Sequence, residues 1–404
     1  MARSGWRKPE SDVRLSDHVS VGVLSQVFPL WRVEEAVEAA GRRERRHRTL
    51  PAAVVTYFAV AMGLYSQESY QDIMERLTEG LSWASGWEEQ YRLPSKSAIF
   101  QARDRLGAEP VRRLFESTAK PLGADDDSGV WLAGRRMVAI DGTGLDVADT
   151  VANDEYFGRP GSSRGQQAAF PMARMVALAE CGSHAIFAAR IGAWSASEHT
   201  LAADLYQDLD SSMLLIADRG FFSYAAWRQA SGTGAALLWR VRTDKSAPKP
   251  EFIEELPDGS WLGHLNRATP AAERNKPPML VRVIDYQIDD GRENPQTYRL
   301  FTTITDPAQA TAEELAAAYT QRWEIESAFD ELKTHQRGPK VVLRSKSPEL
   351  VEQEIWGHLC CHYAIRAIMQ AAAEYGGRDP DRVSFTASLR IIRSTLAQAG
   401  DFSP

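Results

Sequence analysis

The chain has 404 residues, of which 44% are hydrophobic and 25% are charged, and its formal net charge is −7. This length favours two or three structural units of a globular protein rather than a single core. No run of about 18 apolar residues occurs, which excludes a helix that spans a membrane. The three cysteines and eight histidines lack the spacing of a zinc site or a disulfide framework. The first ten residues lack the apolar stretch of a secretion signal, so a cytoplasmic location is expected.

The first part of the chain, residues 1–125, is predicted to be helical because apolar residues recur there at helical spacing. Pro51–Tyr65 is apolar on every side, which predicts a helix buried in the core. Ser69–Leu81 and Pro94–Gly107 have the spacing of a helix-turn-helix, whose second helix has an N-cap at Ser95 and a C-cap at Gly107. Its outward side chains are of kinds that contact phosphates and base edges. They are Lys96, Ser97, Gln101, Arg103 and Arg105.

The charge distribution limits where DNA could bind. A net charge of −7 disfavours nucleic acid over the whole surface, because phosphate binding needs local positive charge. Residues 41–48 contain five arginines, although a solvated basic loop is the simpler interpretation of that segment. Binding to double-stranded DNA is therefore expected to be confined to a few basic surfaces.

Beyond a Gly- and Asp-rich linker at Lys120–Val130, strands and helices alternate. A short apolar strand is predicted to end at Asp141, and a fully apolar strand at Asp218. Chemistry in α/β folds lies at the carboxyl ends of strands, although an aspartate after a strand is often only a turn residue. The predicted elements are strands over 135–140 and 213–217, a hairpin over 168–194 and a helix over 196–209.

From Ala235 to about Thr305 the pattern is β-rich, with strand-like runs separated by Pro, Gly and Asn. Helical spacing returns at Thr311, which forms a capping box with Glu314. Two helices are predicted from there, over 311–333 and 348–374.

One stripe of the helix over 311–333 carries four functional groups. Tyr319, Arg322, Glu326 and Lys333 fall within roughly 60° of one another along about 21 Å of an ideal helix. A salt-bridged surface is one interpretation, since Arg–Glu pairs four residues apart are common on solvated helices. The alternative is a functional face, and the two aspartates that end strands favour it.

The two aspartates and Glu326 make three carboxylates from two strands and a helix. Two-metal phosphoryl transfer needs such a set to hold two divalent cations about 4 Å apart. Hard oxygen ligands without His or Cys suit Mg²⁺ or Mn²⁺. The other three groups of the stripe would contact phosphates, on a basic track extended by Lys340, Arg344 and Lys346. Two rival carboxylates, Asp146 and Asp149, are expected in a loop beyond the strand end.

The spacing Y-x2-R-x3-E-x6-K over 319–333, preceded by DGT at 141–143 and DRGFFSY at 218–224, resembles the DDE insertion-sequence transposases of the Y-R-E-K subgroup. The resemblance implies an α/β (α+β) fold with an RNase H-like catalytic core, a β-rich insertion and an all-helical N-terminal DNA-binding domain. The implied division is a helical domain over 1–125, the core over 130–234 and 306–376, the insertion over 235–305 and a helical tail over 377–404.

The resemblance also implies roles for single residues. The three carboxylates become the catalytic triad and the ligands of two Mg²⁺ ions, which Mn²⁺ can replace. Tyr319, Arg322 and Lys333 become contacts to the DNA strand. Members of this subgroup stack a flipped base on an aromatic residue before the signature helix. Tyr298 has that place here, although the best-known pattern has Trp, and a core aromatic is the alternative.

The implied reaction is cleavage at transposon ends by water, then attack of the freed 3′-hydroxyl on target DNA. In this subgroup a hairpin on the transposon end commonly intervenes. The implied partners are terminal inverted repeats and target DNA, bound by a homodimer that forms on synapsis, in a bacterial cytoplasm and at the nucleoid.

Other classes stay open. An inert DNA-binding regulator derived from a transposase would not need three clustered acids. A generic RNase H-like nuclease would not need the stripe, the insertion and the helical domain. A small-molecule metallohydrolase would normally show grouped histidines.

Overall fold

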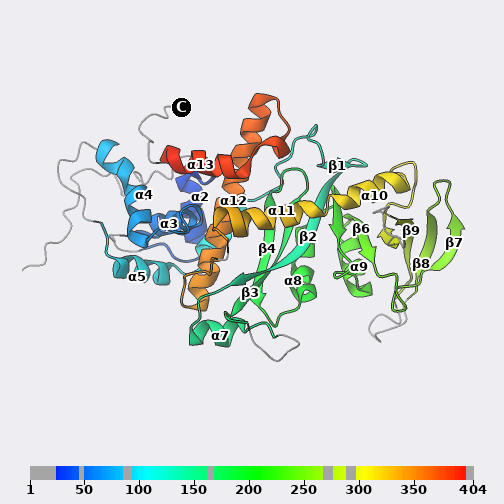
Figure 1. The fold of residues 1–404 in the computed structure, drawn as a ribbon, viewed down its shortest axis with the longest axis horizontal. Coiled ribbons are helices and arrows are strands. Elements are labelled where there is room, and N and C mark those ends of the chain that lie inside the picture. The colour runs from blue at the N-terminus through cyan, green and yellow to red at the C-terminus, as the bar shows by residue number, and fades with distance from the viewer. Residues whose placement is uncertain are drawn as a thin grey trace, which may run out of the picture.

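The computed structural model describes residues 24–44, 50–84, 93–161, 168–266, 276–287, 297–339 and 341–396. Part of the basic segment over 41–48, as well as Lys340, lies outside the described residues. Figure 1 shows a helical region beside a long sheet. Within the described residues, no helix combines the length and the apolar character needed to cross a membrane.

The helical region confirms the predicted helices. α3 is buried at every position, as its uniformly apolar sequence predicts. α5 begins where the Ser95 side chain accepts a hydrogen bond from the backbone N–H of Ala98, and it ends at Gly107 with a φ of +73°, a conformation that glycine adopts without strain. The helices of this region are α1 (Leu24–Val27), α2 (Leu30–Ala39), α3 (Ala52–Leu64), α4 (Tyr70–Ala84), α5 (Lys96–Leu106) and α6 (Glu109–Thr118).

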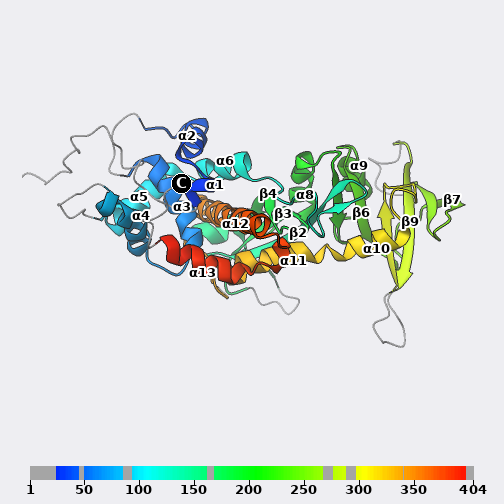
Figure 2. The same cartoon turned by 90° about the horizontal axis from the view of Figure 1, so that it is seen from above.

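α12 (Pro348–Gly376) joins this region to the rest of the molecule by packing along α3. The two backbones approach closely at Gly357, where a Cβ would collide with the carbonyl group of Ala59. Gly63 on α3 faces Cys361 on α12 in the same way. Small residues therefore set the distance between the helices. A 3₁₀ turn, η5 (Pro380–Arg382), and α13 (Phe385–Leu396) then fold back on α12, as seen in Figure 2.

The sheet has the order β4-β3-β2-β5-β6-β10-β9-β8-β7 in the described residues, with β1 beside β2. β3 is antiparallel to its neighbours β4 and β2, and β5 and β6 follow parallel to β2. This is the strand order of an RNase H-like core. The strands are β1 (Trp131–Leu132), β2 (Arg135–Asp146), β3 (Met172–Glu180), β4 (Ile186–Ala193), β5 (Met213–Ala217), β6 (Ala236–Val241), β7 (Glu251–Glu255), β8 (Trp261–Leu265), β9 (Met279–Gln287) and β10 (Thr297–Thr302).

Two expectations about strands were wrong. β2 does not end at Asp141 but continues to Asp146, because antiparallel pairing with β3 holds the strand after its apolar residues end. β6 lies within the range assigned to the insertion, yet it pairs in parallel with β5. It is therefore the last strand of the core, and β10 to β7 extend the same sheet beyond it.

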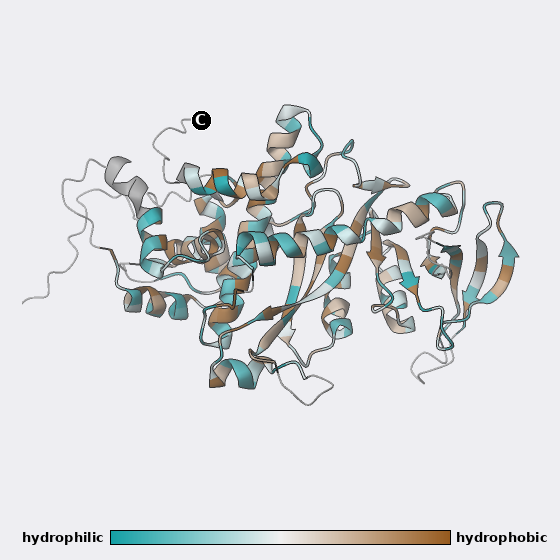
Figure 3. Cartoon of the chain, viewed as in Figure 1, coloured by the Kyte–Doolittle hydropathy of each residue, from teal (hydrophilic) through white to brown (hydrophobic). Residues whose placement is uncertain are grey.

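Helices cover both faces of the core strands, and alternation along β2 separates the two layers. Met137 and Ala139 join the cluster that contains α11 and α12. Val138 and Ile140 join the cluster of α8 (Glu198–Leu205) and α9 (Tyr224–Ser231). In Figure 3, hydrophobic colour runs along the central strands, whereas α5 alternates between the two colours. α7 (Val151–Phe157) lies after β2.

The helix predicted over 311–333 is interrupted, which corrects the expectation of one straight helix. The capping box of Thr311 and Glu314 is present and begins α10 (Ala312–Thr320). The backbone N–H groups of Gln321 and Arg322 then bond three residues back rather than four, the tighter pattern of a 3₁₀ turn. α11 (Trp323–Asp330) continues nearly in line (Figure 2), followed by a π-helical segment, η4 (Glu331–Gln336).

Candidate active site

The two aspartates lie side by side at one edge of the core sheet. In the parallel pair of β2 and β5, Ile140 is opposite Ala217, so Asp141 and Asp218 follow at the same level. Oδ1 of Asp141 accepts a hydrogen bond from the N–H of Gly142 at 2.8 Å.

The α10–α11 turn brings the third carboxylate to the aspartates. Nη1 of Arg322 lies 2.9 Å from Oε1 of Glu326 and 3.6 Å from Oδ2 of Asp141. The hydroxyl of Tyr319 donates to Oδ1 of Asp218 at 3.3 Å. Tyr319 and Arg322 are therefore buried against the aspartates in spite of the interruption, and Glu326, whose side chain is 41% exposed, lies beside Arg322 at the same site.

Lys333 completes the stripe from the π-helical segment. Its Nζ donates to Oγ1 of Thr143 on β2 at 3.0 Å. Burial is the main reason why its pKa is lowered, and the nearby Arg337 adds to the effect. Lys333 therefore contacts β2 at Thr143, two residues beyond Asp141 along the strand.

Burial dominates the ionisation of the site. It raises the pKa of Asp141 to about 6, against the opposing effects of the Gly142 N–H and the Arg322 guanidinium. Burial and the Asp218 carboxylate also raise the pKa of Tyr319. Tyr319 therefore remains a hydrogen-bond donor at neutral pH.

Two charged residues that lie near the site were not predicted from the sequence. Nη1 of Arg240, on β6, lies 3.8 Å from Oδ1 of Asp218, and an arginine within an apolar strand was a signal that could have identified it. Glu198, the first residue of α8, lies over Gly142, where a Cβ would be 2.8 Å from its carboxyl carbon. No local pattern pointed to Glu198.

Tyr298, on β10, lies close to this edge of the sheet, beside Tyr286 and Arg240. Its ring stacks on Tyr286 with centroids 5.4 Å apart. The guanidinium of Arg240 lies 4.2 Å from the centre of the same ring. Arg240 therefore connects Tyr298 to Asp218.

One predicted DNA contact, Arg103, was wrong. It is fully buried, and its Nε donates to Oε1 of Gln353 on α12 at 2.8 Å. The reason is helical spacing: Arg103 shares the inward face of α5 with Ile99 and Leu106, four residues before and three after it. The predicted residues that do lie exposed on α5 are Lys96, Ser97, Gln101 and Arg105.

The predicted basic track and the rival acids also need correction. Arg344 is not free for phosphate, because its Nη1 donates to the carbonyl oxygen of Glu68 at 2.5 Å, whereas Lys346 is exposed. Asp146 belongs to β2 rather than to a loop. Asp149 lies beyond the strand and pairs with Arg159.

The donor set of the site suits a hard divalent cation, because the three side chains offer only carboxylate oxygens. Arg322 contacts two of them, Asp141 and Glu326. Among the described residues, a tighter group of potential ligand atoms, all within 4.8 Å, occurs elsewhere: His184, Glu324 and Asp381.

Comparisons with known proteins match both parts of the chain. Residues 18–116 match the model of the insertion element 4 transposase N-terminal region, and residues 132–364 match that of the transposase DDE domain. The chain is 31% identical to the transposase InsG for insertion sequence element IS4 of Escherichia coli (strain K12), over 92% of this chain and 82% of that protein. It is 30% identical to the putative transposase InsZ of the same strain, over 60% of this chain and 78% of that protein.

A search of solved structures finds the piggyBac transposase in a synaptic complex with hairpin DNA. Its TM-score is 0.48 at 11% identity, over 93% of this chain and 79% of that chain.

Proposed function

The chain belongs to the insertion element 4 family of DDE transposases, enzymes that cleave DNA and transfer strands, and we propose that Asp141, Asp218 and Glu326 are its catalytic carboxylates. The observation that carries this proposal is their convergence. Two aspartates follow paired positions of adjacent parallel strands, and Arg322 connects the first of them to Glu326.

The DDE domain implies the use of a divalent metal, and we propose Mg²⁺, held by the three carboxylates. When bound, such ions lower the pKa of the attacking water and stabilise the leaving oxygen. The all-oxygen donor set supports Mg²⁺, with Mn²⁺ as a substitute.

The remaining groups of the stripe act on the DNA strand. Tyr319 keeps its proton and donates a hydrogen bond, whereas Arg322 and Lys333 neutralise phosphate charge. Water attacks the phosphorus at the transposon end and the 3′-oxygen leaves as a hydroxyl. That hydroxyl then attacks a phosphodiester of the target, whose own 3′-oxygen leaves. Both printed carboxylate contacts of Arg322 are made by Nη1, and a guanidinium has further N–H donors with which it can bind a phosphate.

DNA contacts outside the cleavage site belong to the proposal as well. The exposed face of α5, with Lys96, Gln101 and Arg105, faces DNA in the helical domain over residues 1–125. Tyr298 stacks on a base near the cleaved bond after either Tyr286 or Arg240, which lie against its ring from neighbouring strands, moves away. The ends are held by a homodimer that forms on synapsis.

The test uses a labelled duplex that carries the inverted repeat flanking the reading frame, with purified protein and Mg²⁺. We expect breaks at the outer edge of the repeat with the wild type and with Asp149→Ala, a nearby acid outside the site, and none with Asp218→Ala. Binding without cleavage by the wild type, even with Mn²⁺ or pre-nicked DNA, would favour an inert regulator. Cleavage indifferent to the repeat would favour a general nuclease.

A further inference from the structure

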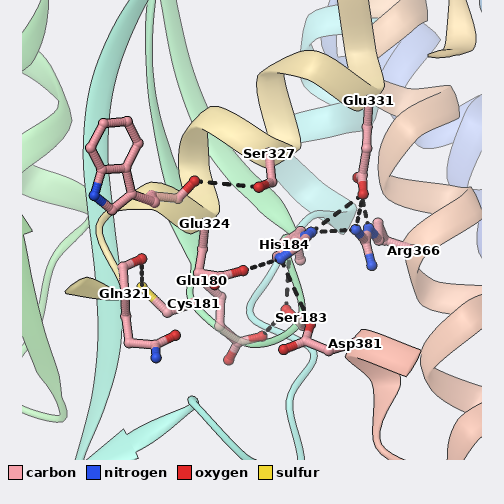
Figure 4. A network of polar contacts seen from close by, with 12 residues as sticks. Glu180, Cys181, Ser183, His184, Gln321, Glu324, Ser327, Glu331, Arg366 and Asp381 are labelled. Carbon is pink, nitrogen blue, oxygen red and sulfur yellow. Dashed lines mark hydrogen bonds and ion pairs between the residues drawn. The ribbon is translucent and has the colours of Figure 1, made fainter. Parts of the chain in front are cut away.

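The β3–β4 turn, residues 181–185, contacts the turn between α10 and α11 at Gln321 and the first turn of α11 at Glu324 (Figure 4). The buried thiol of Cys181 donates to the carbonyl oxygen of Gln321 at 3.5 Å. Nε2 of His184 bonds the carboxylate of Glu324. A single turn therefore holds the residue before Arg322 and the residue two positions after it.

Both nitrogens of the His184 ring contact carboxylates. Besides the bond of Nε2 to Glu324, Nδ1 lies 3.3 Å from Oε1 of Glu331, and Oδ1 of Asp381 on η5 lies 3.7 Å from Nε2. Nη2 of Arg366 also contacts Nδ1. Burial and this guanidinium lower the pKa of the ring, but its hydrogen bonds to Glu324 and Glu331 outweigh them and raise the pKa to about 9, so the ring is an imidazolium at neutral pH. The ring is only 13% exposed, which leaves these partners little competition from water.

Glu331 ties this ion pair to α12. Its carboxylate accepts from Nε of Arg366 at 2.9 Å and lies 3.1 Å from Nε2 of His362. His184 itself has a φ of +55°, an uncommon conformation for a residue with a side chain, which persists where surrounding contacts enforce it. The ring is thus fixed from α11, η4, α12 and η5 together.

The geometry of α11 makes this contact relevant to the site. Glu324 and Glu326 are two residues apart, so they project from nearly opposite sides of the helix, about 200° apart. The helix is held by His184 on one side and presents Glu326 to Asp141 on the other. α11 has eight residues and begins without a side-chain cap, so its own ends do little to fix its position.

We propose that His184 is a positioning residue for DNA cleavage: its ion pair with Glu324 holds the first turn of α11 and thereby places Arg322 and Glu326 against Asp141. The inference rests on the proposed function of these residues. The contacts that it protects are the 3.6 Å and 2.9 Å approaches of Arg322 to Asp141 and Glu326. A misplacement of about 1 Å in such a site can cost roughly 100-fold in rate.

The test compares the wild type with His184→Ala, His184→Lys and Leu205→Ala. Leu205 is fully buried on α8, on the opposite face of the sheet, so its truncation destabilises the core without touching α11. Three quantities are measured on each full-length protein: the cleavage rate at saturating inverted-repeat DNA, the Mg²⁺ concentration for half-maximal rate, and the hydrogen exchange of the amides over 322–330.

For His184→Ala we expect a cleavage rate lower by roughly 10- to 100-fold, a higher Mg²⁺ requirement and faster exchange over 322–330, with unchanged affinity for the DNA. His184→Lys keeps the positive charge and should recover part of each loss. Leu205→Ala should lower the melting temperature yet keep the Mg²⁺ requirement and the exchange of this segment.

Two results would overturn the proposal. One is a His184→Ala protein whose rate, Mg²⁺ requirement and exchange match those of Leu205→Ala. The other is a stoichiometric transition metal in the wild type that His184→Ala loses, since the group would then be a metal site and not an ion pair. If the wild type fails to cleave but His184→Ala still loosens residues 322–330, the placement of α11 stands and the proposed function fails.

Discussion

His184 makes folding stability depend on pH in a defined window. Burial and the Arg366 guanidinium at Nδ1 lower the pKa, but the hydrogen bonds that the ring donates to Glu324 and Glu331 outweigh them and raise the pKa to about 9, from an ordinary value of 6.5. A group whose pKa is raised by folding stabilises fully below its unfolded pKa and loses that contribution as pH rises through its folded pKa. The difference corresponds to about 3 kcal/mol of unfolding free energy, present below pH 6.5 and lost above about pH 9.

The assay is urea unfolding of the wild type and of His184→Gln, which cannot carry the charge, at several pH values from 7 to 9.5. The advantage of the wild type should shrink by about 2 kcal/mol across this range. Asp381, whose pKa burial raises to about 6 and the His184 charge lowers, titrates below the window in the wild type, and groups that do not contact His184 cancel in the difference. A difference that stays constant with pH would refute the assignment of His184 as an imidazolium.

Other predictions follow from packing, from the surface and from the site. Gly357→Ala should lower the unfolding free energy by about 3 kcal/mol, because its Cβ collides with the backbone of Ala59. Gly376→Ala should not, because its Cβ would meet only the Arg378 side chain, at 3.9 Å; equal stabilities would contradict the close approach of α3 and α12. Arg103→Met should lower the unfolding free energy by about 1–3 kcal/mol, because the buried side-chain oxygen of Gln353 on α12 loses its donor. It should leave the salt dependence of DNA binding unchanged. Lys96→Ala should keep the melting temperature and reduce the slope of log affinity against log salt by about 1. If Arg103→Met reduced this slope and Lys96→Ala did not, Arg103 would be a DNA contact as the sequence predicted. Chelation of divalent cations should abolish cleavage reversibly but leave binding to the inverted repeat intact, so cleavage in excess chelator would exclude metal catalysis.

Much of the site could be predicted because its residues belong to a regular helix pattern and to two apolar strands. Helical spacing placed Tyr319, Arg322 and Glu326 on one face, and a 3₁₀ turn at residues 321–322 does not rotate that face away from the sheet. The residues before Asp141 and Asp218 were apolar enough to identify two buried strands. Parallel pairing of these strands then places the two aspartates at the same level.

The errors arose where tertiary contacts override a local pattern. β2 continues to Asp146 because β3 pairs with it, although its last residues are Gly, Thr and Asp. Arg103 lies on the inward face of α5 by its helical spacing, and its charge is tolerated there because Gln353, 250 positions away, supplies a partner, a bond of which composition gives no sign. The group of His184, Glu324 and Asp381 was not predicted for the same reason, since the two carboxylates lie far from His184 in the sequence.

The central claim, that Asp218 is a ligand of the catalytic metal, is tested most directly by Asp218→Cys in the cleavage assay on inverted-repeat DNA. A thiolate binds Mg²⁺ poorly and Mn²⁺ better. We predict that this variant fails to cleave with Mg²⁺ and regains cleavage with Mn²⁺, whereas Asp218→Ala remains inactive with both. Full activity of Asp218→Cys or Asp218→Ala with Mg²⁺ would contradict the account.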